Sequence, residues 1–211
     1  MTNVVLTTDA VQSVRCDGME ISLTIKCEGL SMQASLRKVQ ESADQLLGTL
    51  QAVSVDPSSF SIEKLDSLSF DDSQKQSARI VLKARGACDF EMMQRIWTTI
   101  TQMPFSIEMQ VRFYLEDEDS YFQALHENAL VQAQIQAGKY SQLLGSSFPT
   151  CLSLKFENLH EECQSLQSLN SCSPEEYLDN NFPSFWSQAK PPYVTLKTVA
   201  ETSWTFSSLN N

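Results

Sequence analysis

Three alanines spaced four residues apart limit how the middle of this chain can fold. Ala129, Ala133 and Ala137 lie inside one long amphipathic segment within residues 116–157. Residues four apart share one face of a helix, so these alanines form a stripe of small side chains along it. Such a stripe lets another layer of secondary structure approach the helix closely. We therefore expect a long helix packed tightly on a sheet.

Both ends of this segment carry residues that begin and end helices. The acidic run at 116–119 would complement the partial positive charge of a helix start, and Gly145 can adopt the left-handed conformation that ends a helix. A calcium site would also use carboxylates, but the run lacks the spacing and the glycine of an EF-hand. We interpret it as helix-start charge.

Alternating apolar and polar residues mark the clearest strands, because every second side chain of a strand points to the same face. The expected strands lie at 4–14, 19–27, 60–70, 78–84, 105–115, 151–157 and 193–209. Besides the alanine-striped helix, apolar stripes predict a helix at 32–50, capped by Ser31, and another that starts after Asp89.

The resulting order is strand-strand-helix-strand-strand-helix-strand-helix-strand-strand. Helices that return after pairs of strands favour an α+β fold with helices packed on a mostly antiparallel sheet. At 211 residues, the chain is expected to form a single α+β domain over 1–211. Residues 158–192 are expected to be a polar insertion or long loop before the last strand.

This insertion combines a polar, acidic background with large apolar residues. Leu159, Cys163, Leu166 and Leu169 have helical spacing and predict one short helix; a second could start at Pro174. A solvated loop has no need for so many large apolar groups, and aromatic side chains tend to dominate the energy of interfaces. The candidate interaction surface therefore consists of Tyr177, Phe182, Phe185 and Trp186.

Composition and charge exclude some classes of protein. The net charge is −11 and no basic patch is visible, which argues against a nucleic-acid partner. No apolar run is long enough to span a membrane. The first six residues do not resemble a signal peptide, so we expect a cytoplasmic protein with reduced thiols; a leader trimmed from the sequence would change this to an envelope or secreted location.

No catalytic, cofactor or metal site emerges from the sequence, and we expect a protein that is not an enzyme. His160, Cys163 and Cys172 are the best metal candidates, but a tetrahedral site needs about four ligands. Nothing places His126 beside a cysteine that it could activate. Cys27 and Cys151 fall in expected strands, where a free thiol behaves as a small apolar group.

Around the alanine stripe, the chain resembles the SIMPL domain family, which includes a kinase-associated signalling protein and bacterial periplasmic and outer-membrane immunogenic proteins. The family helix carries alanines every four residues and ends in Leu-Gly; here Leu144-Gly145 fits, and Ser141 stands where another alanine is usual. Of the family's Pro-Asp before the second strand, Cys16-Asp17 keeps only the Asp. The resemblance implies an α+β fold and assembly into rings or larger oligomers, without a catalytic centre.

Two functions from different classes follow. The first is a non-enzymatic protein that acts by self-assembly or by binding an unknown protein partner. It would use an exposed strand edge, the alanine-striped helix or the insertion. The alternative is a small-ligand-binding or thiol-reactive stress-response protein with a pocket under residues 158–192.

Overall fold

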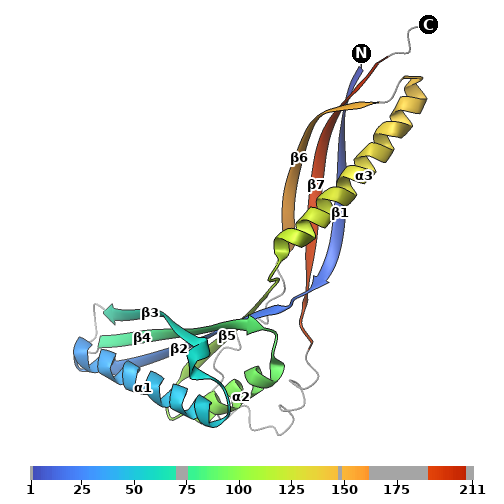
Figure 1. The fold of residues 1–211 in the computed structure, drawn as a ribbon. Helices are drawn as coiled ribbons and strands as arrows, with labels where there is room; N and C mark the ends of the chain where they lie inside the picture. Colours follow the sequence, from blue (N-terminus) through green and yellow to red (C-terminus); the bar gives the residue numbers. More distant parts are fainter. Residues whose placement is uncertain (1, 70–75, 147–148, 162–189, 208–211) are drawn as a thin grey trace. The chain divides into compact units, whose positions relative to one another are not determined.

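The computed structural model describes residues 2–69, 76–146, 149–161 and 190–207 (Figure 1). The chain divides into two compact units. Unit 1 comprises Met1–Arg15, Leu115–Cys163 and Tyr193–Asn211, and unit 2 comprises Cys16–Tyr114 and Gln164–Pro192. The described residues form three α-helices and two antiparallel sheets in the order β-β-α-β-β-α-β-α-β-β, which confirms the α+β class and the order of elements.

Unit 1 is a three-stranded sheet with one long helix on it. The sheet has the order β1-β7-β6, with β1 at Thr2–Arg15, β7 at Tyr193–Phe206 and β6 at Thr150–Glu161. The helix α3, Glu118–Leu144, lies along this sheet and packs on β1 and β7 (Figure 1). The first and last strands of the chain therefore pair along their whole length, from Thr2 opposite Phe206 to Arg15 opposite Tyr193.

The alanine stripe is where α3 meets this sheet. Ala129, Ala133 and Ala137 are each 0% exposed. The Thr8 hydroxyl of β1 donates a hydrogen bond of 2.8 Å to the backbone carbonyl of Ala129. A sheet side chain can reach a helix carbonyl in this way because the helix side chains between the two layers are small. The close helix–sheet contact expected from the stripe is confirmed.

The ends of α3 also follow the sequence. The Asp117 side chain accepts a hydrogen bond from the backbone N–H of Ser120, which satisfies one of the free donors at the helix start. Glu118 and Asp119 occupy the first turn. Gly145 ends the helix with φ 58°, in the left-handed region that glycine adopts readily.

Unit 2 is a four-stranded sheet with its helices on one face (Figure 1). The strand order is β3-β4-β2-β5. Its elements are β2 (Gly18–Gly29), α1 (Met32–Ala52), the short 3-10 helix η1 (Pro57–Ser59), β3 (Phe60–Ser69), β4 (Gln76–Ala87), α2 (Phe90–Thr101) and β5 (Ile107–Tyr114).

The core of unit 2 is formed by the alternating apolar residues of three neighbouring strands. Ile21, Leu23 and Ile25 of β2 are at most 1% exposed, and the alternate residues of β4 and β5 are buried beside them. The helix α1 packs on β2 and β4, with Val39, Leu46 and other buried side chains facing them. The intervening residues of each strand point to the opposite face of the sheet. That face carries polar and charged side chains.

Two expectations need correction. The strands form two sheets, because alternation shows that a segment is a strand but not which strand it pairs with. The insertion was also placed too early: β6 continues to Glu161, and Asn158 and Leu159 pair with Thr198 and Lys197 of β7. The helix expected to begin near Leu159 is therefore wrong at its start, and the rest of that expectation lies outside the described residues.

Candidate functional site

The strand β6 lies at one edge of the unit 1 sheet. It pairs with β7 along one edge, and within the described residues nothing pairs with its other edge. Three large apolar side chains on it are open to solvent: Leu152 is 58% exposed, Leu154 42% and Leu159 44%. The strand thus offers both free backbone hydrogen-bonding groups and apolar side chains.

The position of α3 explains why β6 is uncovered. The helix packs over β1 and β7 and reaches β6 through His126. The His126 ring stacks on Phe156 with ring centroids 4.1 Å apart, and its Nε2 lies 2.7 Å from the Asn158 side-chain oxygen. The same oxygen accepts a hydrogen bond of 3.0 Å from the Thr198 hydroxyl of β7. His126 therefore links one part of β6 to the helix, and the three exposed leucines of β6 remain uncovered.

Other exposed apolar side chains also concentrate in unit 1. Single exposed apolar residues are common on any protein surface, whereas a concentration of them marks an interaction surface. In unit 2 the exposed large apolar residues of the described chain are Leu30, Val53, Ile62 and Leu65. In unit 1 they are Val5, Val11, Val131, Ile135, Tyr140, Leu143, Leu144, Leu152, Leu154, Leu159 and Tyr193.

Cys151 differs from its expectation. It lies in β6 as expected but is exposed, whereas Cys27 of β2 is buried. In the sequence, Cys27 continues the apolar positions that alternate along its strand, whereas Cys151 falls outside the alternation of Leu152 and Leu154. Their burial differs because Cys27 lies on a central strand covered by α1, and Cys151 lies on the uncovered edge strand.

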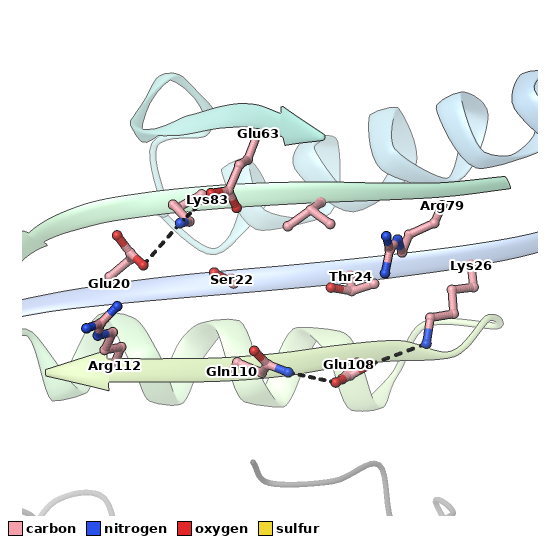
Figure 2. Close-up of a pocket in the computed structure, with 11 residues that line it drawn as sticks. Glu20, Ser22, Thr24, Lys26, Glu63, Arg79, Lys83, Glu108, Gln110 and Arg112 are labelled. Atoms are coloured by element: carbon pink, nitrogen blue, oxygen red, sulfur yellow. Dashed lines mark hydrogen bonds and ion pairs between the residues drawn. The ribbon is translucent and has the colours of Figure 1, made fainter. Parts of the chain in front are cut away.

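Unit 2 contains a polar groove on the sheet face opposite its helices (Figure 2). Its cavity volume is about 380 Å³. The central strand β2 runs along its floor, and β4 and β5 supply its sides (Figure 2). The polar side chains that line it from these strands are Glu20, Ser22, Thr24 and Lys26 of β2, Arg79 and Lys83 of β4, and Glu108, Gln110 and Arg112 of β5.

Ion pairs cross the groove between neighbouring strands. The Lys83 ammonium lies 2.6 Å from a Glu63 carboxylate oxygen and 3.2 Å from one of Glu20. Hydrogen bonds from Lys83 to Glu63, and then to Glu20, raise the pKa of Lys83 above its usual 10.5, so this side chain stays positively charged at neutral pH. Toward the other end of β2, Lys26 lies 3.5 Å from Glu108.

A second ionic group borders the groove. Arg79 Nη2 donates to Asp66 Oδ2 at 2.6 Å, and the Lys64 ammonium lies 2.9 Å from the same oxygen. Hydrogen bonds from Arg79, and then from Lys64, lower the pKa of Asp66 below its usual 3.8. The Nε atom of Arg79 is buried and has no hydrogen-bond partner in the described structure.

The structure describes some of the candidate residues selected from the sequence, and others lie outside the described residues. Tyr177, Phe182, Phe185 and Trp186 lie outside the described residues, as do Cys163 and Cys172. His160 lies on β6. The alanine stripe is buried within unit 1, so it is not available as an interaction surface. Among the described residues, no three side chains of His, Cys, Asp or Glu are grouped as metal ligands.

The sequence alone did not predict the groove, although its residues form a recognisable pattern. Its residues are the polar positions that alternate with the buried ones along these strands. Lys83 lies opposite Ser22, and Ser22 lies opposite Gln110, but these neighbours become visible only when the strand order and register are known.

The two units define an α+β protein in which antiparallel sheets carry helices. The model of the SIMPL family, described as a protein of unknown function (DUF541), matches residues 4–182. The chain therefore belongs to the SIMPL family, as the alanine stripe and its Leu-Gly ending indicated. Its last strand, β7, lies beyond the matched residues.

A comparison with curated proteins gives no match. In the parts of the chain that the structure describes, no helix is long and apolar enough to cross a membrane.

Proposed function

We propose that this SIMPL protein is not an enzyme and acts by self-assembly, with the free edge of β6 as its contact surface. The observation that carries this proposal is the exposure of Leu152, Leu154 and Leu159 on an edge strand that has no described partner along its outer edge. An unknown protein partner would bind the same edge by adding one of the partner's strands to the sheet. A cytoplasmic location remains part of the proposal.

Backbone chemistry favours this use of the edge. An edge strand presents a row of unpaired N–H and C=O groups, which is a ready template for another strand. Proteins that avoid such pairing keep edge strands short or place charges on them. The strand β6 is long, from Thr150 to Glu161, and its exposed leucines favour pairing, whereas Lys155 and Glu157 between them oppose it. Added strands gain affinity from backbone hydrogen bonds and specificity from side-chain contacts.

The other surfaces considered from the sequence support assembly less directly. The alanine stripe is buried in its own unit. Residues 162–189 lie outside the described structure, so the aromatic surface from Tyr177 to Trp186 remains a hypothesis. Small-ligand binding remains the second candidate, and the groove of unit 2 is the observation that favours it.

A charged residue on the edge tests the proposal. We expect the wild-type chain to have a mass in solution that is a multiple of 23.7 kDa, and Leu154→Lys to lower this mass, because lysine on an edge disfavours strand pairing. Multi-angle light scattering of the purified full-length chain measures both. The matched control is Val131→Lys, which puts the same charge on an exposed position of α3.

Circular dichroism must show that both variants remain folded, and Leu159→Lys repeats the test near the other end of the strand. A wild-type chain that stays at the mass of one subunit would contradict self-assembly. A wild-type oligomer that both lysine variants of β6 leave intact would show that assembly uses a different surface.

A further inference from the structure

The groove of unit 2 has its negatively charged groups already occupied. Glu20 lies 3.2 Å from Lys83 and 3.9 Å from Arg85. Glu63 is the second partner of Lys83, at 2.6 Å. Glu108 lies 3.5 Å from Lys26 and accepts a hydrogen bond of 2.8 Å from Gln110. The lining carboxylates are thus engaged by cationic and amide donors.

Several donor and hydroxyl groups of the groove have no partner. Within the described residues, no hydrogen bond or ion pair engages the Ser22 hydroxyl, the Thr24 hydroxyl or the Arg112 guanidinium. The buried Nε of Arg79 is a further free donor. A free donor that is shielded from water costs stability unless a partner satisfies it. The unused hydrogen-bonding capacity of the groove therefore suits a ligand that brings acceptors.

Two of these groups, Ser22 and Arg112, come together with the Lys83 ammonium from three strands. Ser22 lies on β2 directly opposite Lys83 on β4. Arg112 lies on β5 opposite Glu20, which is the next residue along β2 on the same face as Ser22. Side chains that are diagonal neighbours on one sheet face lie within reach of long residues such as arginine. Figure 2 shows Ser22 on the floor, with Lys83 on one side of β2 and Arg112 on the other.

Lys83 keeps binding capacity despite its two ion pairs. An ammonium group has three N–H donors, and Glu20 and Glu63 use two of them. Arg112 has a planar guanidinium whose geometry matches the two oxygens of a carboxylate or phosphate. Ser22 adds a hydroxyl at the centre. Together they provide the donors that an anionic group requires.

We propose that this groove binds a small ligand through an oxyanion, either a carboxylate or a phosphate, seated over Ser22 between Lys83 and Arg112. The charge balance favours this choice: the chain has a net charge of −11, yet four cationic side chains and three carboxylates line the groove. A cavity of about 380 Å³ accommodates a small molecule. The polar lining disfavours a lipid or another apolar ligand. The site is independent of assembly through β6, which belongs to unit 1.

Calorimetric titration of the full-length chain with succinate, and separately with inorganic phosphate, tests this site. At constant ionic strength we expect saturable binding of at least one probe. Arg112→Gln should weaken it about tenfold or more, because it removes a charge-assisted hydrogen bond. The matched control is Arg37→Gln on α1, which removes the same charge from an exposed position of the same unit. This control should leave the affinity unchanged.

A second variant is expected to bind the probe more tightly rather than more weakly, which strengthens the test. Glu20→Gln removes a carboxylate that competes for Lys83 and lies opposite Arg112, so it should tighten binding of the same probe. Preference for succinate or for phosphate identifies which oxyanion the groove takes. The proposal is overturned if neither probe binds the wild-type chain. It is also overturned if Arg112→Gln and Arg37→Gln weaken binding equally, because the attraction would then be diffuse.

Discussion

Single residues show where the sequence pattern alone predicts which side chains are buried. The alternation in 19–27 identified the buried face of β2, and the four-residue spacing identified Ala129, Ala133 and Ala137 as a contact stripe. Both predictions depend only on the geometry of the element that carries the residue. Cys151 shows the limit. Its burial depends on whether a helix distant in the sequence covers its strand, and the local pattern does not contain that information.

The alanine stripe leads to a prediction about packing. Ala133→Leu should destabilise the protein by about 1–3 kcal/mol, because added methylene groups have no space where α3 meets its sheet. Gln132→Leu is the matched control, since it adds an apolar side chain at the preceding position of the same helix, which is exposed. Its effect should stay within about 0.5 kcal/mol. Urea unfolding measures both, and equal losses would contradict a tight contact at Ala133.

At the scale of secondary-structure elements, the spacing of apolar residues and the capping residues identified nearly every segment as a helix or a strand. Ser31, Asp89 and Asp117 each accept a hydrogen bond at the start of a helix. The sequence could not show which strands pair. The central strand of unit 1 is β7, the last element of the chain, and its partners are the first strand and β6. The groove was missed for the same reason, because its residues meet only through strand order and register.

The pairing of β6 with β7 predicts that the insertion between them is dispensable for folding. Glu161 at the end of β6 pairs with Thr195 near the start of β7, so the two strand ends are neighbours. Replacing residues 164–189 with a short Gly/Ser linker should keep the sheet of unit 1, because a short connection can join adjacent antiparallel strands. Circular dichroism and thermal unfolding test this, and loss of cooperative unfolding would show that the segment contributes to the core.

The same variant examines the aromatic residues of the insertion. It lacks Tyr177, Phe182, Phe185 and Trp186. If the free edge of β6 is the contact surface, light scattering should give the variant the oligomeric state of the wild-type chain. A folded variant that no longer assembles would instead favour the aromatic surface, as the sequence analysis considered.

The whole molecule has a division that the order of elements did not reveal. The sequence was interpreted as a single α+β domain, and the SIMPL resemblance covered nearly the whole chain except residues 158–192. In the structure, unit 1 draws on the beginning, the middle and the end of the chain, whereas residues 16–114 of unit 2 are continuous. Continuity of this kind is invisible in hydrophobic periodicity, because both units use the same patterns of strand and helix.

This division predicts that residues 16–114 fold alone. They contain the four strands of the β3-β4-β2-β5 sheet and the helices α1 and α2. The buried residues Leu23, Leu46, Leu82, Ile96 and Met109 all lie within this fragment, so its core needs no residue from unit 1. Segments with their own hydrophobic core can in principle fold independently. The fragment should therefore show cooperative thermal unfolding and slow hydrogen exchange in the central strands β2 and β4.

The complementary fragment, residues 115–211, provides the control for this prediction. It lacks β1, one of the two strands that pair with β7, and so cannot complete the sheet of unit 1. We expect it to show little cooperative structure, because the backbone groups of β7 that bond to β1 and the apolar face under α3 would be exposed. An unfolded 16–114 fragment would contradict the prediction and assign a necessary part of the unit 2 core to residues 164–192. Folding of 16–114 together with failure of 115–211 would show that only unit 1 requires both ends of the chain.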